Sequence, residues 1–171
     1  MPAAVIDTCF LINWSRFSEC GKLTLIFNRL FMPEITFNEI KSDTAISLAS
    51  NWLSKRYLVL TPILPQNEGN ITEILRIVAD YPQIPSVDPP ELYAFSLAIR
   101  LKIPMLTDNK APKRITQLIP KFSTVRVLDS LDILKLIADK GFDLKELVLK
   151  FMNETKFKFS KRRLKELGIH V

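Results

Sequence analysis

The sequence has little of the residue types on which the commonest catalytic sites depend. It contains one histidine, His170, beside the C-terminus, and two cysteines, Cys9 and Cys20, that form no CxxC pair. This disfavours a Ser–His–Asp or Cys–His mechanism, a zinc site and a histidine-rich transition-metal site. The two thiols are expected to be buried or incidental, in a reducing compartment. Any catalysis must therefore depend on carboxylates.

Long apolar runs are also lacking. No stretch approaches the roughly 20 apolar residues of a membrane span. Residues 1–7 lack the charged start and apolar middle of a signal peptide. We therefore expect a cytoplasmic protein with no membrane partner. The 171 residues are 47% hydrophobic, which fits one domain spanning residues 1–171 with a single core.

The charge balance is basic, and the excess lies near the C-terminus. The net charge is +6, and residues 140–171 hold nine Lys or Arg against four Asp or Glu. Such a basic extension indicates a polyanionic partner. The alternative is that these lysines and arginines only solvate exposed helix faces.

Short apolar runs alternate with segments of helical periodicity along the chain. Near-continuous apolar runs are typical of parallel strands covered on both faces, so we predict an α/β fold of three layers, α/β/α, with a central parallel sheet and an extra C-terminal helical segment. We expect a loop over 62–70 and a helix over 23–30. The expected strands are 3–6, 30–33, 57–61, 103–107 and 125–128.

Four acidic residues stand at strand-to-helix transitions. Ligands of parallel sheets bind outside the carboxyl ends of the strands, where these side chains are expected to converge. Converging carboxylates repel one another unless a divalent cation lies between them, and hard cations prefer carboxylate oxygens. The pattern therefore predicts a metal site. The four residues are Asp7, Glu39, Glu91 and Asp108.

Each acid also has an ordinary structural interpretation. Asp7 is placed to accept backbone N–H groups of the following helix, and Asp108 with Asn109 is suited to starting a turn. Glu39 can be one more exposed helix carboxylate. Glu91 stands at the third position of a helix that begins after Asp88, where it can reach back to the N-cap. We prefer Glu91 as the ligand and Asp88 as the cap, and both can share the site through water.

Taken in order along the chain, these segments resemble the PIN-domain nucleases, from the first strand to about residue 130. The likeness is greatest to a group of toxin-like prokaryotic PIN proteins whose third acid lies in an Asp-Pro-x-Glu segment. It depends on the ordered set of segments more than on any single one. The segments are Val5–Thr8, Met32–Glu34 with Glu39–Ile40, Asp88–Leu92 with Ala94, Leu97 and Ala98, and Leu106–Lys110.

The resemblance implies a metal-dependent endoribonuclease that uses Mg²⁺ or Mn²⁺, with the four acids as catalytic metal ligands. It implies supporting roles for Thr8, Asp88 and Asn109, a homodimer, and either a toxin restrained by a small antitoxin or an RNA-processing enzyme. Lys110, Lys113 and Arg114 either hold the RNA backbone or only balance the acids. The substrate is RNA in this interpretation.

The sequence departs from the commoner family pattern after Asp108. Many members carry a further acid one helical turn later, whereas Ala111 and Pro112 follow Lys110 here. A second metal ion is therefore expected to be held poorly. The second hypothesis follows from this departure: a PIN-like module that binds RNA or protein and has weak or no catalytic activity.

Overall fold

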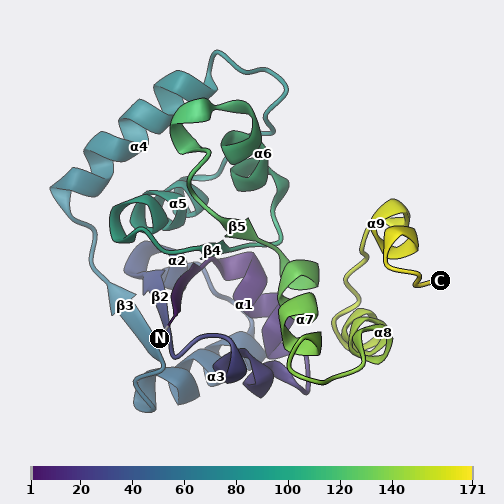
Figure 1. Ribbon diagram of the computed structural model, residues 1–171. Helices are drawn as coiled ribbons and strands as arrows, with labels where there is room; N and C mark the ends of the chain where they lie inside the picture. The colour runs from purple at the N-terminus through teal and green to yellow at the C-terminus, as the bar shows by residue number, and fades with distance from the viewer. Residues whose placement is uncertain (1, 171) are drawn as a thin grey trace.

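The computed structural model describes residues 2–170, apart from the side chains of residues 66 and 67. Its described strands form one five-stranded sheet, and every neighbouring pair is parallel (Figure 1). The predicted α/β fold with a central parallel sheet is confirmed. The strand order is β3 (Leu58–Thr61), β2 (Arg29–Pro33), β1 (Ala3–Ile6), β4 (Met105–Leu106) and β5 (Val127–Leu128).

Helices cover both faces of the sheet because side chains alternate along each strand. In β1, Ala4 and Ile6 pack into one core and Val5 packs into the other. The first core is covered by α1 (Thr8–Ser15), α3 (Asp43–Ser54) and α7 (Ser130–Ala138). The second core is covered by α4 (Pro65–Val78), α5 (Pro89–Leu101) and α6 (Lys110–Leu118).

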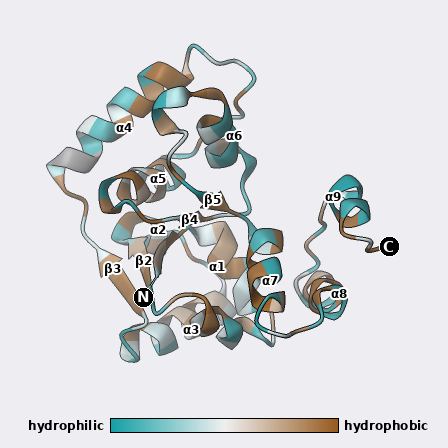
Figure 2. Ribbon diagram, in the orientation of Figure 1, coloured by the Kyte–Doolittle hydropathy of each residue, from teal (hydrophilic) through white to brown (hydrophobic). Residues whose placement is uncertain are grey.

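The C-terminal residues extend the first core beyond α7. Figure 1 shows α8 (Leu144–Thr155) and α9 (Lys161–Glu166) on the far side of α7 from the sheet. Phe151 is fully buried there, with its ring centroid 5.6 Å from that of Trp14, and Leu164 is buried with it. Figure 2 shows that α9 is mostly hydrophilic, whereas the strands and α5 are mostly apolar. The segment is thus packed on the core and keeps a polar outer surface.

Two expectations about local structure are wrong. In place of the predicted helix 23–30, the chain forms a 3-10 helix, η1 (Cys20–Leu25), and then enters β2. The strand forms because its side chains alternate between the two cores: Leu30 and Met32 face one and Phe31 faces the other. The predicted loop 62–70 contains the start of α4, whose first turn begins at Pro65. Proline is well suited to a first helical position because its missing N–H is not needed there.

Among the described residues, no helix is both long and apolar enough to cross a membrane.

The topology explains why acidic residues meet at one edge. β1 lies between β2 and β4, so the chain leaves three adjacent strands at their carboxyl ends. The short helix α2 (Glu34–Asn38) follows β2 and contacts the start of α5, where Thr36 Oγ1 donates a hydrogen bond of 3.2 Å to the Pro90 carbonyl. The first turn of α5 therefore lies at the same edge as the end of β1. A second 3-10 turn, η2 (Pro120–Phe122), precedes β5.

Candidate metal-binding and active site

Asp7 is a buried carboxylate that also caps the next helix. Its Oδ1 accepts a hydrogen bond of 2.9 Å from the Phe10 N–H, and its Oδ2 accepts one from the Thr107 hydroxyl. Only 2% of Asp7 is exposed, and this burial raises its pKa to about 6, although the hydrogen bonds from Thr107 and Phe10 oppose the rise. The capping role expected from the sequence and the burial of a charge coexist in this residue.

The register between β1 and β4 produces the contact with Thr107. Val5 pairs with Met105 and Ile6 with Leu106, so the next step along the ladder places Thr107 opposite Asp7. Cys9 adds a weaker contact, with Sγ 3.2 Å from Asp7 Oδ2. Burial and then the charge of Asp7 raise the pKa of the Cys9 thiol far above its usual range. Cys9 is therefore a neutral hydrogen-bond donor rather than a nucleophile.

Glu91 is the second buried acid at this edge. It is 6% exposed, and its Oε1 has no hydrogen-bond partner among the described residues. Burial, followed by the charge of Asp7, raises its pKa to about 7, while hydrogen bonds from the Asn109 side chain and the Asp88 backbone lower it. Asp88 occupies the N-cap position of α5 as expected, but its side chain forms no capping hydrogen bond in the described structure. Prolines at the first two positions leave few N–H groups for a cap to satisfy.

Three of the four predicted ligands line one cavity. Glu39, the exposed C-cap of α2, joins Asp7 and Glu91 around a space of about 190 Å³. The predicted supporting residues lie there too. Thr8 donates its hydroxyl to the Thr36 carbonyl at 2.9 Å, which ties the start of α1 to α2. The lining residues are Asp7, Thr8, Cys9, Ile12, Thr36, Glu39, Asp88, Pro90, Glu91 and Asn109.

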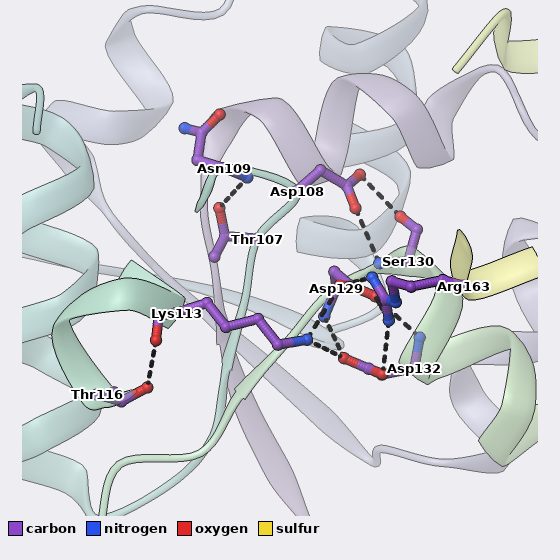
Figure 3. Close-up of polar contacts among 9 residues, drawn as sticks. All are labelled: Thr107, Asp108, Asn109, Lys113, Thr116, Asp129, Ser130, Asp132 and Arg163. Atoms are coloured by element: carbon purple, nitrogen blue, oxygen red, sulfur yellow. Dashed lines mark hydrogen bonds and ion pairs between the residues drawn. The ribbon is translucent and has the colours of Figure 1, made fainter. Parts of the chain in front are cut away.

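Asp108 lies beside this cavity, and its carboxylate is held by other groups. Ser130 donates its N–H to Oδ1 and its hydroxyl to Oδ2, both at 2.8 Å (Figure 3). Asn13 donates to Oδ2 at 2.7 Å. Trp14 Nε1 in turn donates to Ser130 Oγ at 2.9 Å. Burial raises the Asp108 pKa, although the Asn13 and Ser130 hydrogen bonds oppose the rise, and its charge also raises the pKa of Asp7.

The predicted cations differ in their surroundings. Lys113 forms ion pairs with Asp129 at 3.1 Å and Asp132 at 2.9 Å, and Arg163 of α9 pairs with the same two carboxylates (Figure 3). Lys110 and Arg114 are exposed and form no ion pair within the described residues. Lys113 thus balances acids, as one of the two alternatives held, but its partners Asp129 and Asp132 are not among the four predicted ligands.

Solved structures share this arrangement of strands and helices, and one of them is a toxin–antitoxin complex. A chain of the crystal structure of VapBC2 from Rickettsia felis, bound to a DNA fragment from their promoter, matches with a TM-score of 0.56. The sequences are 13% identical, and the match covers 74% of this chain and 98% of that chain. The likeness establishes a common fold. No protein-family model matches the sequence, and no curated protein is significantly similar to it.

The donors around the cavity suit a hard divalent cation. The described residues contain no preformed group of three or more His, Cys, Asp or Glu side chains close enough to hold a metal. They do present two buried carboxylates with raised pKa values, one with an unpartnered oxygen. Carboxylate oxygens completed by water are the ligands that Mg²⁺ and Mn²⁺ prefer. The side chains of Asp7 and Glu91, with Glu39 on the same cavity, are therefore of the type that such an ion would take as ligands.

The sequence analysis missed the neutral residues that position the acids. Thr107, Asn13 and Ser130 donate the hydrogen bonds that orient Asp7 and Asp108. Thr107 directly precedes Asp108, and Asn13 interrupts an apolar helical run, so both carried a local signal. Ser130 is 116 residues from Trp14, with which it bonds, and no local pattern pointed to it.

Proposed function

We propose that this protein is a PIN-like, metal-dependent endoribonuclease that hydrolyses phosphodiester bonds at the cavity between α1, α2 and α5. We regard residues 1–171 as one PIN-like domain with a basic C-terminal extension over residues 140–171. The proposal depends chiefly on one observation: Asp7 and Glu91 are both buried at one cavity with raised pKa values, and Glu91 Oε1 has no partner in the described structure.

Burying two interacting carboxylates has a free-energy cost that the protein itself does not offset. Nothing described within the cavity lining is cationic, since its charged members are all Asp or Glu. A protein retains such an arrangement when an external cation, or a proton, completes it. Raised pKa values at a cleft are typical of functional sites. A divalent ion held by Asp7 and Glu91 would offset their negative charge and favour their ionised forms.

Asp7, Glu91 and Glu39 are the residues that would hold the ion, with Asp108 beside them. When bound, Mg²⁺ or Mn²⁺ would supply Lewis-acid activation of a water and stabilisation of the developing negative charge on phosphate. In the reaction a bond forms between the water oxygen and phosphorus, and the bond from phosphorus to the leaving oxygen breaks. The water loses a proton, and the leaving oxygen gains one.

The remaining residues fix the acids in place. Thr107 and the Phe10 N–H hold both Asp7 oxygens, which keeps that carboxylate in one orientation. Asn13 and Ser130 do the same for Asp108. Lys110 and Arg114, exposed on α6 beside Asp108 and Asn109, are placed to contact the phosphates of the substrate. Preorganised side chains of this kind lower the cost of binding a cation and orienting a scissile phosphate.

The biological context that we propose is a toxin restrained by a small antitoxin, with the protein acting as a homodimer. This part follows from the resemblance to toxin-like PIN proteins. The fold shared with the VapBC2 chain supports it at the level of fold. An RNA-processing enzyme with the same chemistry is the other form of this proposal.

The second candidate is a PIN-like module that binds RNA or protein and does not cleave. Asp108 favours it, because its carboxylate is already held by Asn13 and Ser130 rather than directed into the acidic cavity. The absence of a preformed group of three acidic ligands among the described residues favours it as well. The two candidates differ in whether a divalent ion at Asp7 and Glu91 produces cleavage.

The test is cleavage of a mixed RNA pool by the purified protein with Mg²⁺ or Mn²⁺, beside an EDTA control. Glu39→Gln is compared with Glu34→Gln, because both acids lie at α2 but Glu34 is not among the described residues that line the cavity. We expect metal-dependent cleavage that Glu91→Gln and Glu39→Gln weaken and Glu34→Gln leaves unchanged. Cleavage that persists in EDTA, or equal effects of the two α2 variants, would refute the proposed site.

A further inference from the structure

A second, larger cleft opens next to the acidic cavity. It encloses about 580 Å³ between α6 on one side and residues 157–166 of the C-terminal segment on the other. Asn109 lines both spaces, and Asp108 lies at the boundary, so the cleft leads directly to the carboxylates. Its lining residues include Asp108, Asn109, Lys110, Arg114, Phe157, Lys158, Arg162 and Arg163.

The charges in this cleft divide into paired and unpaired groups. Arg163 and Lys113 are neutralised by Asp129 and Asp132, and Arg162 pairs with Glu166 at 2.9 Å. Lys110, Arg114 and Lys158 line the cleft, are exposed, and have no ion pair in the part of the chain that the structure describes. Three cations on two facing walls, without carboxylate partners, form a site for a polyanion.

An aromatic ring lies among these cations. Phe157 is half-buried and lines the cleft, and its ring packs edge-on against Phe159 with centroids 5.2 Å apart. Its backbone N–H donates to Thr155 Oγ1 at 3.1 Å, which fixes the start of the extended segment. A rigid aromatic side chain beside phosphate-binding cations is the combination by which proteins hold single-stranded nucleic acids.

Residues 157–166, which form the C-terminal wall of the cleft, are anchored to the start of α7, the same helix end that orients Asp108. Arg163 pairs with Asp129, the N-cap of α7, and the next residue, Ser130, donates to Asp108. Leu164 and Phe159 are buried in the first core. The wall is therefore held at a fixed position relative to the carboxylates, as a substrate-positioning surface must be.

We propose that this cleft binds a single-stranded RNA segment, with Lys110, Arg114 and Lys158 on its phosphates and Phe157 stacked on one base, and delivers the strand to the acidic cavity. The volume is in the range of small-ligand pockets, about 300–1,000 Å³, and so suits a nucleotide or two rather than a duplex. An acidic protein segment meets the same cations but gains nothing from the part of the Phe157 ring that lines the cleft. The delivery of the strand to the acids rests on the nuclease function proposed above, whereas the binding does not.

Binding is measured in EDTA by fluorescence anisotropy of a labelled single-stranded RNA over a series of salt concentrations, so that no cleavage is needed. Each phosphate contact contributes about 0.7 to the slope of log K against log salt concentration. We expect Lys158→Ala and Arg114→Ala each to weaken binding and to reduce the slope by about 0.7. The matched control Lys145→Ala, an exposed lysine of α8 outside the described cleft lining, should leave both unchanged.

Stacking is tested separately with Phe157→Leu, which keeps an apolar side chain. We expect it to weaken binding by about fivefold or more, and to have no effect on a strand of the same length that lacks bases. Phe142→Leu, at an exposed aromatic residue outside the described cleft lining, is the control. Thermal melts confirm that each variant is folded.

The outcomes separate the two proposals. Wild-type affinity and salt slope in Lys158→Ala and Arg114→Ala would overturn the cleft proposal even if the protein cleaves RNA. Binding of polyglutamate as tight as that of RNA, unaffected by Phe157→Leu, would assign the cleft to an acidic protein partner and overturn it too. Loss of affinity in the cleft variants of a protein that shows no metal-dependent cleavage would support the binding site and refute only the nuclease.

Discussion

Asp7 and Asp129 have the same local setting and opposite electrostatic environments. Each follows a strand of the one sheet and caps the next helix through a hydrogen bond to a backbone N–H. The pKa of Asp7 is raised to about 6 because the residue is buried. Burial also acts to raise the pKa of Asp129, but a hydrogen bond from Arg163 and the charges of Lys113 and Arg163 bring it down to about 2.

The two strand ends differ in the charged groups that surround them. The protein supplies cations for Asp129, which therefore fastens α6 and α9 to α7. It supplies none within the acidic cavity for Asp7, whose carboxylate is held by hydrogen bonds, chiefly from Phe10 and Thr107, alone or with a proton or an external cation. A strand–Asp–helix pattern thus has a structural role in one place and a proposed catalytic role in another, and the tertiary neighbours decide which.

The largest expected effect is on activity. Replacing Asp7 with Asn keeps the cap to Phe10 but removes the charge that would hold the cation, so RNA cleavage with Mg²⁺ should fall by about a thousandfold or more, the equivalent of several kcal/mol of charge stabilisation. Asp129→Asn leaves the acidic cavity intact and loosens only the contacts of Lys113 and Arg163, so it should lower the cleavage rate far less. Measured cleavage rates that fall equally in the two variants would remove the distinction between the two sites.

Asp7→Asn should also stabilise the metal-free fold. A folded-state pKa near 6, above the ordinary 3.8, means that the charged Asp7 destabilises the protein at pH values above 6. In EDTA at about pH 8, Asp7→Asn should therefore raise the free energy of unfolding by up to about 3 kcal/mol.

This gain should shrink as the pH falls through 6 and vanish below about 4, because Asp7 itself is then protonated in both states. Urea unfolding at about pH 8 and pH 5 measures it. A variant less stable than the wild type at pH 8 would show that Asp7 is stabilised by the protein alone.

The hydrogen bonds that position Asp108 should matter less than the acids themselves. Asn13→Ala removes the 2.7 Å bond to Asp108 Oδ2 at a half-buried site, and such supporting bonds are typically worth about 10- to 100-fold in activity or metal affinity. Asn51→Ala, at an exposed site of α3, is the matched control and should be silent. The measurement is the Mg²⁺ dependence of the cleavage rate, and unchanged activity in Asn13→Ala would place Asp108 outside the site.

The smallest expected effect concerns the ion pairs that Asp129 forms with Lys113 and Arg163. Asp129→Asn retains the cap but loses the ion pairs to Lys113 and Arg163. About a third of each of these side chains is exposed, so solvent screening limits the loss of stability to about 1–2 kcal/mol at neutral pH. Because the folded-state pKa is lowered, this contribution is present above about pH 4 and is lost as the pH falls toward 2.

Thermal unfolding of Asp129→Asn and the wild type across this pH range checks the prediction. The sign of the pH dependence is opposite to that of Asp7. If the difference between the wild type and Asp129→Asn grew as the pH fell, the ion pairs would not be the source of the stability.

Much of the sheet was predictable because apolar runs encode parallel strands directly. The strands at Ala3–Ile6 and Leu58–Thr61 lie where periodicity placed them, and the helix after Asp88 begins with its two prolines as expected. The start of α4 was not predictable from the same rules, because Pro65 with its polar neighbours reads equally as a loop. Asp88 lies at the N-cap as predicted, but its side chain forms no capping bond there, because the prolines that mark the helix start also remove N–H donors.

By itself, the sequence determined the order of strands and helices and placed acids after adjacent strands, because these depend on local periodicity and on the carboxyl ends of parallel strands lying at one edge. Only the tertiary structure decided the state of each acid. Asn13, Ser130 and Thr107 reach Asp108 and Asp7 from distant segments, and Arg163 reaches Asp129 across 34 residues. Burial and nearby charge set a carboxylate's pKa, and both arise from packing rather than from chain order.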